Sequence, residues 1–136
     1  MDSKTKDSQI RYKNWLFQYV VARIMKFFCY ILFSKSLDRY YVGYTSDLEE
    51  RLKLHNSGYF GGKSYTHSTS DWELYLLIPC DTIKEAVYVE SKVKKMKSRK
   101  YIENLKKYPE MVKNILNKFN NWYHKTLLFK YIGWNF

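Results

Sequence analysis

The chain of 136 residues has room for one domain with a modest core, and its apolar content of 46% excludes a disordered chain. Lys and Arg number 24 against 13 Asp and Glu, a formal net charge of +11. This charge favours an anionic partner, either nucleic acid or an acidic membrane surface. Lys, Asn, Tyr and Ile are also plentiful, as in chains encoded by A·T-rich DNA, so composition alone does not decide between partners.

The N-terminal segment 1–24 begins with polar residues and becomes a mixed polar and apolar stretch, and Met25 would suit a natural start. We therefore expect residues 1–24 to be an extension outside the ancestral domain. The apolar run 15–33 has the length of a membrane span, but three polar residues interrupt it, namely Gln18, Arg23 and Lys26. We expect neither a signal peptide nor a membrane span here.

A hairpin is predicted next. The aromatic and branched run 27–33 predicts a buried strand, residues 34–39 a turn and residues 40–44 a second strand. Cys29 lies in the first strand and Cys80 in a later apolar segment, with no CxxC pair between them. Both cysteines are therefore interpreted as buried thiols in a reducing cytoplasm.

The first helix is predicted over residues 47–56. Ser46 and Glu49 form an S-x-x-E capping box at its start, and Asn56 with Gly58 would end it. Only Leu48 and Leu52 face inward, so this helix should lie on the surface of the sheet.

A loop and a third strand follow. Residues 57–71 are rich in Gly, Ser and Thr, and a loop of this length suggests a function beyond connection. Residues 72–80 predict a strand that Pro79 ends. Thr82 and Glu85 form a second capping box, T-x-x-E, which predicts a helix over about 83–97.

The core side of the 83–97 helix is a stripe of four apolar residues, Ala86, Val89, Val93 and Met96. Glu90 falls within about 40° of Ala86 around the axis, at the edge of this stripe. A carboxylate there would be desolvated unless a cation lies beside it. The alternative is a glutamate whose stem packs while its carboxylate reaches water.

The C-terminal part is predicted to be helical. Ser98 would cap a helix to about residue 107, and Pro109 suits the first turn of another helix. Apolar residues recur in it at helical spacing: Met111, Val112, Ile115, Leu116 and Phe119. Residues 121–136 are aromatic and should pack on the domain or on a second copy in a homodimer. We expect an α+β fold, a three-stranded antiparallel sheet flanked by helices, divided into segments 1–24, 25–108 and 109–136.

Several residues that can do chemistry are predicted to meet at one end of the hairpin. Arg51 and His55 are four residues apart and share a helix face. Tyr41 lies on the strand that leads into this helix, Tyr30 on its partner strand, and Glu90 would come from the later helix. Each has a simpler explanation, because strand tyrosines are commonly core residues and a helical His and Arg pair commonly lies on the surface.

Together and in this order, the residues resemble the GIY-YIG endonuclease family, especially its small single-domain members. The resemblance covers about Phe27 to Tyr108 and depends on "CYILFS", "YYVGYTSDLEERLKLHN", "KSYTHS", "DWELY" and "EAVYVESKVKKMKSRK". The two family triplets read Phe28-Cys29-Tyr30 and Tyr41-Val42-Gly43 here, and neither change loses a reactive group.

The resemblance implies a metal-dependent DNA endonuclease that leaves a 5′ phosphate and a 3′ hydroxyl. Glu90 would hold one divalent ion, Mg²⁺ or alternatively Mn²⁺, and Arg51 would contact the phosphate. Tyr30 or Tyr41 would orient and help to deprotonate the attacking water, while His55 would take that proton or hold a tyrosine in place. Which of the three is the base stays open. Gly43 would allow close approach of the backbone beside the site.

Residues 92–107 carry eight Lys and Arg against one acid, Glu103, which indicates phosphate contacts. The predicted DNA-binding residues are Lys63, Lys94, Lys95, Lys97, Arg99 and Lys100. They carry no base-reading information, so we expect low sequence specificity or selection of a DNA structure.

Two alternatives to the nuclease remain at this point. One is a catalytically inactive nucleic-acid-binding module that retains the fold, and the other, less favoured, is a protein of the membrane surface. The cellular role stays open among DNA repair, recombination, defence and mobile-element maintenance.

Overall fold

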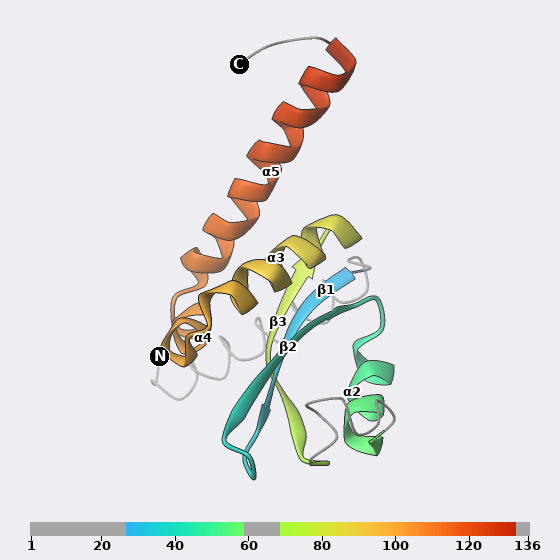
Figure 1. The fold of residues 1–136 in the computed structure, drawn as a ribbon, viewed down its shortest axis with the longest axis vertical. Helices are drawn as coiled ribbons and strands as arrows, with labels where there is room; N and C mark the ends of the chain where they lie inside the picture. Colours follow the sequence, from blue (N-terminus) through green and yellow to red (C-terminus); the bar gives the residue numbers. More distant parts are fainter. Residues whose placement is uncertain (1–26, 59–68, 133–136) are drawn as a thin grey trace, which may run out of the picture.

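The structure is a computed structural model that describes residues 27–58 and 69–132 (Figure 1). Its strands are β1 (Phe27–Ser34), β2 (Arg39–Thr45) and β3 (Trp72–Cys80), all antiparallel, in the order β2-β1-β3. The prediction of a three-stranded antiparallel sheet in an α+β fold is thereby confirmed. The expected extension 1–24 and Lys63 lie outside the described residues, and the predicted division into segments stays a prediction.

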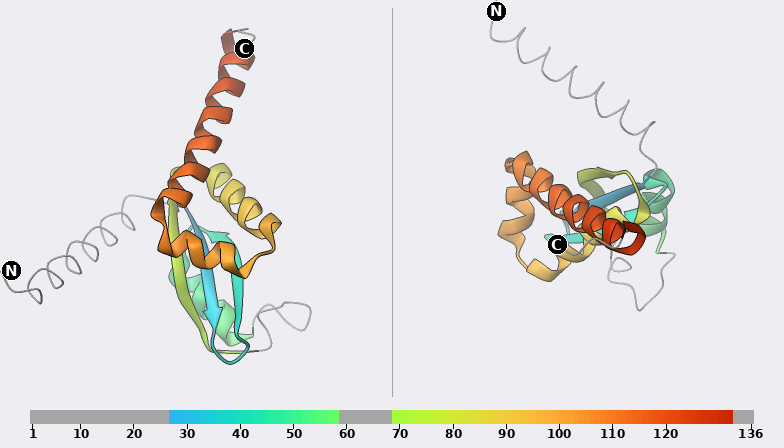
Figure 2. Two further views of the ribbon diagram at one scale, coloured as in Figure 1. Left: turned by 90° about the vertical axis from the view of Figure 1, so that its left-hand side faces the viewer. Right: turned by 90° about the horizontal axis from the view of Figure 1, so that it is seen from above.

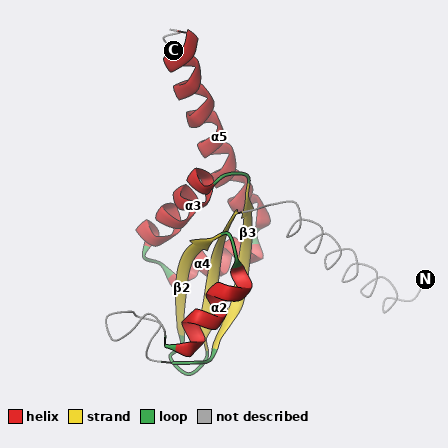
Figure 3. Cartoon of the chain, turned by 90° about the vertical axis from the view of Figure 1, so that its right-hand side faces the viewer, coloured by secondary structure: helices red, strands yellow, loops and turns green. Residues whose placement is uncertain are grey.

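Four helices fall within the described residues: α2 (Leu48–Ser57), α3 (Ile83–Met96), α4 (Arg99–Lys107) and α5 (Pro109–Ile132). Helix α2 covers one face of the sheet, and α3 and α4 lie on the opposite face (Figure 3). Helix α5 packs on α3 and α4 and then extends away from the sheet (Figure 2). No helix in the described part of the chain is both long and apolar enough to cross a membrane.

Strand β1 supplies both cores, because it is central and its side chains alternate between the two faces. Cys29 and Ile31 are buried with the apolar side chains of α3, whereas Tyr30 and Leu32 are buried with Trp72 on the face of α2. Both cysteines are free and buried, as predicted. Burial raises the pKa of each thiol above its ordinary value.

The cap of α2 is Asp47, and the prediction of Ser46 as its cap is wrong. The Asp47 carboxylate accepts a hydrogen bond from the backbone of Glu50 at 3.1 Å. Thr45 fixes this arrangement, because its hydroxyl oxygen accepts from the Asp47 amide and donates to the Asp47 carbonyl, both at 3.0 Å. The helix ends at Gly58, whose φ of 72° favours glycine.

Helix α3 begins and ends close to the predicted bounds. Thr82 caps it, as expected, whereas the Glu85 carboxylate accepts from the amide of Asp81, one residue before the cap. The inclusion of Met96 in the core stripe is wrong, since 46% of its surface is exposed. The helix ends at Met96 and Lys97 has a φ of 47°, so the chain turns there into α4.

Pro79 does not end β3, contrary to the prediction. It pairs with Phe28, and the strand continues to Cys80. The reason is that β3 is an edge strand, where a residue without an amide hydrogen removes no ladder hydrogen bond on its open side.

Two polar links close the end of the sheet opposite the start of α3. Asp71 accepts from Ser34 Oγ and Thr69 Oγ1, each at 2.6 Å, and these hydrogen bonds lower the pKa of the Asp71 carboxyl. Arg99 of α4 donates to both carboxylate oxygens of Asp38 in the β1–β2 turn, at 2.7 and 3.0 Å. These bonds join the hairpin to the start of β3 and to α4.

Candidate active site

Tyr30 and Gly43 form the centre of the site. They are directly opposed in the pairing of β1 with β2. A Cβ atom at position 43 would lie 2.5 Å from Tyr30 Oη and 2.6 Å from its Cζ, so the tyrosine ring lies directly against the glycine backbone. The sequence therefore uses a glycine here to admit a large ring on the neighbouring strand.

His55 is the partner of Tyr30. Its Nε2 lies 2.8 Å from Tyr30 Oη, and each side chain is only 1% exposed. Tyr41 completes the ring cluster, with its ring centroid 4.5 Å from that of His55 and 6.2 Å from that of Tyr30. The structure thus brings together three of the predicted site residues, from β1, β2 and α2.

A pair of hydrogen bonds that the sequence analysis missed fixes the end of α2. Asn56 Nδ2 donates to the Trp72 carbonyl at 3.0 Å, and the Trp72 amide donates to Asn56 Oδ1 at 2.8 Å. The Asn56 side chain thus pairs with the backbone of Trp72 in the way that a further strand would, in addition to the pairing of Trp72 with β1. Because Asn56 follows His55 directly, these bonds also fix the position of the imidazole. The sequence offered only a polar residue at a helix end.

Burial controls the protonation of the pair. It lowers the pKa of His55 to about 4, with a further contribution from the charge of Arg51, so the imidazole is neutral at pH 7. It raises the pKa of Tyr30 above its ordinary value of 10, and neighbouring Tyr41 adds to this effect. The charge of Arg51 and a side-chain hydrogen bond from it oppose the rise but do not reverse it. The hydroxyl of Tyr30 is therefore protonated in the resting site.

Glu90 of α3 is linked to the ring cluster through Lys94. Its side chain is 13% exposed and forms an ion pair with Lys94, one turn further along α3. Lys94 Nζ lies 5.9 Å from the centroid of the Tyr41 ring. The charge of Glu90 adds to the rise in the pKa of Tyr30, whereas the charge of Arg51 opposes that rise. The carboxylate of α3 and the guanidinium of α2 thus act on one hydroxyl, and the cation expected beside Glu90 is Lys94.

The predicted phosphate contacts in the described residues are all exposed: Lys94, Lys95, Lys97, Arg99 and Lys100. Arg99 is engaged within the chain, because it also donates to Glu103 at 3.1 Å besides its bonds to Asp38. A phosphate contact by Arg99 would have to replace these bonds. The structure thus gives this arginine a structural role that the sequence analysis did not foresee.

The donor set fits a metal ion held by few protein ligands. Within residues 27–58 and 69–132 there is no group of three or more His, Cys, Asp or Glu side chains that could hold an ion. Mg²⁺ is commonly bound by one or two carboxylates, with water and substrate phosphate completing its octahedron. Glu90, whose side chain is 13% exposed, suits such a site.

Comparison with known proteins agrees with this geometry. Residues 26–104 match the family model described as the GIY-YIG catalytic domain. The chain belongs to this family. The resemblance drawn from the sequence is thereby confirmed, and the matched region ends in α4, before α5 begins.

Among similar proteins, the UPF0213 protein YazA of Bacillus subtilis is 35% identical over 88 residues, which span 62% of this chain and 86% of YazA. A UPF0213 protein of Syntrophus aciditrophicus is 36% identical over 70 residues, 52% of this chain and 79% of that protein. Their names state no activity. No solved structure matches the chain.

Proposed function

We propose that this GIY-YIG protein is a metal-dependent DNA endonuclease that leaves 5′-phosphate and 3′-hydroxyl ends. The observation that carries the proposal is the buried hydrogen bond between Tyr30 and His55, next to Tyr41 and Arg51. Burying two polar rings next to a half-buried charge costs stability, whereas an apolar cluster would serve folding better. Such an arrangement is typical of a catalytic site.

Arg51 is proposed to bind the phosphate under attack. Its planar guanidinium can donate to two phosphate oxygens at once, which a lysine cannot match. Helix α2 fixes the position of Arg51, because Asp47 caps its first turn and Asn56 ties its last turn to β3. A donor held in this way can stabilise the charge that develops on phosphorus.

Tyr41 is proposed to meet the attacking water, since it is half-buried whereas Tyr30 is 1% exposed. A tyrosine that removes a proton needs a nearby cation to stabilise its phenolate, and Lys94 Nζ lies 5.9 Å from the Tyr41 ring. Tyr30 and His55 then act as positioning residues that hold Tyr41 through ring packing. The neutral His55 can accept the hydrogen bond of the Tyr30 hydroxyl.

Glu90 is proposed to hold one Mg²⁺, or Mn²⁺ in its place. When bound, such an ion supplies a Lewis acid for the phosphoryl oxygen and stabilises the leaving 3′ oxygen. Lys94 now neutralises Glu90, and its ammonium would be released toward the phosphate backbone when Glu90 binds an ion. This would reconcile the ion pair with the DNA contact predicted for Lys94.

Exposed lysines would hold the DNA backbone beside the site, in particular Lys95, Lys97 and Lys100. Phosphate contacts position the substrate but do not read its sequence, so we propose low sequence specificity or structural selectivity. The buried free thiols of Cys29 and Cys80 suit a reducing cytoplasm as the place of this activity.

The test is cleavage of nicked, flapped and duplex DNA by the purified protein with Mg²⁺, Mn²⁺ or a chelator. We expect cleavage only with metal, and a loss of about 10²- to 10³-fold in Arg51→Lys. Arg39→Lys, at an exposed residue of β2, is the matched control. Tyr41→Phe should lose more activity than Tyr30→Phe. Equal cleavage by all variants would indicate a contaminant and reject the proposal, and binding without cleavage would favour the inactive binding module.

A further inference from the structure

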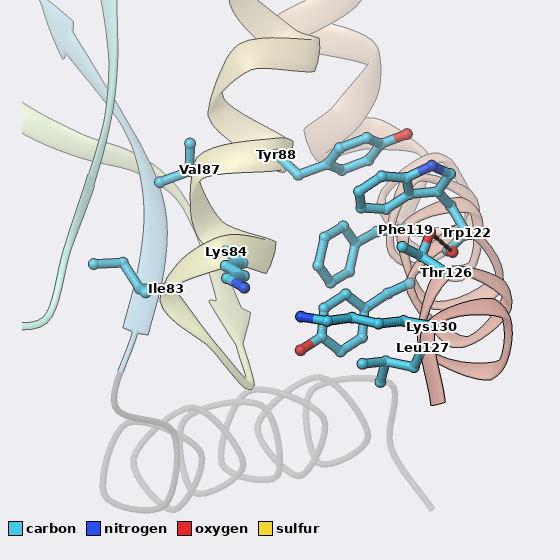
Figure 4. A pocket seen from close by; sticks show the side chains of 10 residues that line it. Ile83, Lys84, Val87, Tyr88, Phe119, Trp122, Thr126, Leu127 and Lys130 are labelled. Carbon is cyan, nitrogen blue, oxygen red and sulfur yellow. Dashed lines mark hydrogen bonds between the residues drawn. The ribbon is translucent and has the colours of Figure 1, made fainter. Parts of the chain in front are cut away.

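A groove of about 680 Å³ lies between the start of α3 and the later half of α5 (Figure 4). Aromatic side chains form its walls: Tyr88 on α3, and Phe119, Trp122 and Tyr123 on α5. Lys84 and Lys130 also line it, and none of the described residues that line it carries a carboxylate. The groove is therefore apolar inside and positively charged along its lining.

The rings form a preorganised surface. Phe119 is 5% exposed and stacks on Tyr123, with 5.6 Å between the ring centroids and an interplanar angle of 14°. The ring centroid of Tyr88 lies 5.2 Å from that of Phe119. Lys84 Nζ lies 5.8 Å above the Tyr123 ring. Trp122 differs from these rings, since 58% of its surface is exposed. A tryptophan this exposed contributes little to the folded core and leaves much of its surface available to a ligand.

We propose that this groove binds unpaired nucleobases of single-stranded DNA. Bases stack on aromatic side chains regardless of sequence, and lysines beside them attract the backbone phosphates. Charge complementarity favours this ligand over an apolar peptide or a second copy of this basic chain, because α5 carries four lysines and a single acid, Glu110. The chain as a whole carries a net charge of +11.

The groove would give the nuclease a preference that its active site lacks. Phosphate contacts by lysines do not distinguish duplex from unpaired DNA, whereas stacking requires exposed bases. Helix α5 also lies outside residues 26–104, the part that matches the GIY-YIG catalytic domain. The inference rests on the proposed function, because the ligand of the groove is the DNA substrate of the nuclease. The groove would select substrates that contain a single-stranded segment.

The test is the affinity for a fluorescent oligo(dT) of about 12 nucleotides and for a blunt duplex of the same length, measured by anisotropy with a chelator present. Trp122→Ala should weaken oligo(dT) binding about ten-fold and change duplex binding by less than about two-fold. Trp122→Phe, which keeps a ring, should retain most of the affinity. Tyr108→Ala is the matched control, an aromatic residue 41% exposed that does not line the groove. Circular dichroism would verify that each variant is folded.

Two results would overturn the inference. One is equal affinity of Trp122→Ala and Tyr108→Ala for oligo(dT), and a wild-type protein that does not bind oligo(dT) counts as the same result. The other is a Trp122→Ala variant whose oligomeric state differs from that of the wild type in sedimentation while its oligo(dT) affinity is unchanged. That result would make the groove an interface between copies. Because a chelator prevents cleavage in this assay, failure of the nuclease proposal would not alter its outcome, and failure of this inference would leave the cleavage assay intact.

Discussion

The two faces of the sheet differ in chemistry although one strand supplies both. On the face of α3, β1 contributes Cys29 and Ile31 to a core that is almost wholly apolar. On the face of α2, the same strand contributes Tyr30, whose hydroxyl is hydrogen-bonded to buried His55. The first face can account for stability by burial alone, whereas the second maintains polar groups that burial penalises.

This difference separates the residues that fold the protein from those that we propose do its chemistry. Alternation along β1 allows the apolar face to hold the strand in place, so that the polar face need not be optimal for folding. A substitution on the apolar face should therefore act on stability, and one on the polar face mainly on activity. Four predictions test this division.

The largest effect on stability is expected from Ile31→Ala on the apolar face. Ile31 is 0% exposed, so its truncation should reduce the free energy of unfolding by about 2–5 kcal/mol. Leu74→Ala, at a position 42% exposed on β3, is the control and should cost less than about 1 kcal/mol. Urea denaturation measures both. Cleavage per folded molecule should be unchanged, and a loss of that activity would contradict the division.

Gly43→Ala should damage both stability and activity, because the added methyl group would occupy the space of the Tyr30 ring. We expect a loss of about 1–3 kcal/mol and disruption of the hydrogen bond to His55. In a Tyr30→Ala background the same substitution should cost less, since the clash is gone. Additive losses in this double-mutant cycle would show that the glycine serves another purpose.

The pH dependence of stability should reveal His55. Its pKa is about 4 in the folded chain against an ordinary value of 6.5, so between these values the unfolded chain binds more protons. Its contribution is fully present above about pH 6.5 and is lost as the pH falls toward 4. His55→Gln should flatten the melting temperature over this interval. The lowered pKa of Asp71 acts only below its ordinary value of 3.8, so Asp71 should affect both proteins alike. Equal slopes in the two proteins would refute this assignment.

The smallest effect is expected from Lys94→Met. Removing the ammonium leaves Glu90 without its cation, so Mn²⁺ should bind about three-fold more tightly, in line with the modest energy of a half-exposed ion pair. Lys95→Met removes the same charge from the same helix and should leave Mn²⁺ affinity nearly unchanged. Titration calorimetry without DNA measures both, and equal affinities would exclude competition by Lys94.

Local patterns predicted much of the fold and the residues of the candidate site. The predicted hairpin placed Tyr30 and Tyr41 on partner strands, and spacing placed Arg51 and His55 on one helix. The features that the sequence analysis missed join residues far apart in the chain, such as Asn56 with Trp72 and Arg99 with Asp38. Each contact depends on how the folded helices and strands pack together, and the spacing of apolar residues in the sequence does not predict that packing. The predicted cap of α2 was also wrong by one residue, because the S-x-x-E pattern does not reveal the two hydrogen bonds by which Thr45 fixes the backbone of Asp47.

The most direct measurement is the single-turnover DNA cleavage rate of Glu90→Gln beside its melting temperature. Gln has the shape of Glu without its charge, and Glu90 lies outside both buried clusters, so the variant should melt close to the wild type. Its cleavage rate should fall by at least about 100-fold, because the proposed metal ligand is lost. A folded Glu90→Gln that cleaves DNA within a few-fold of the wild-type rate would contradict the account.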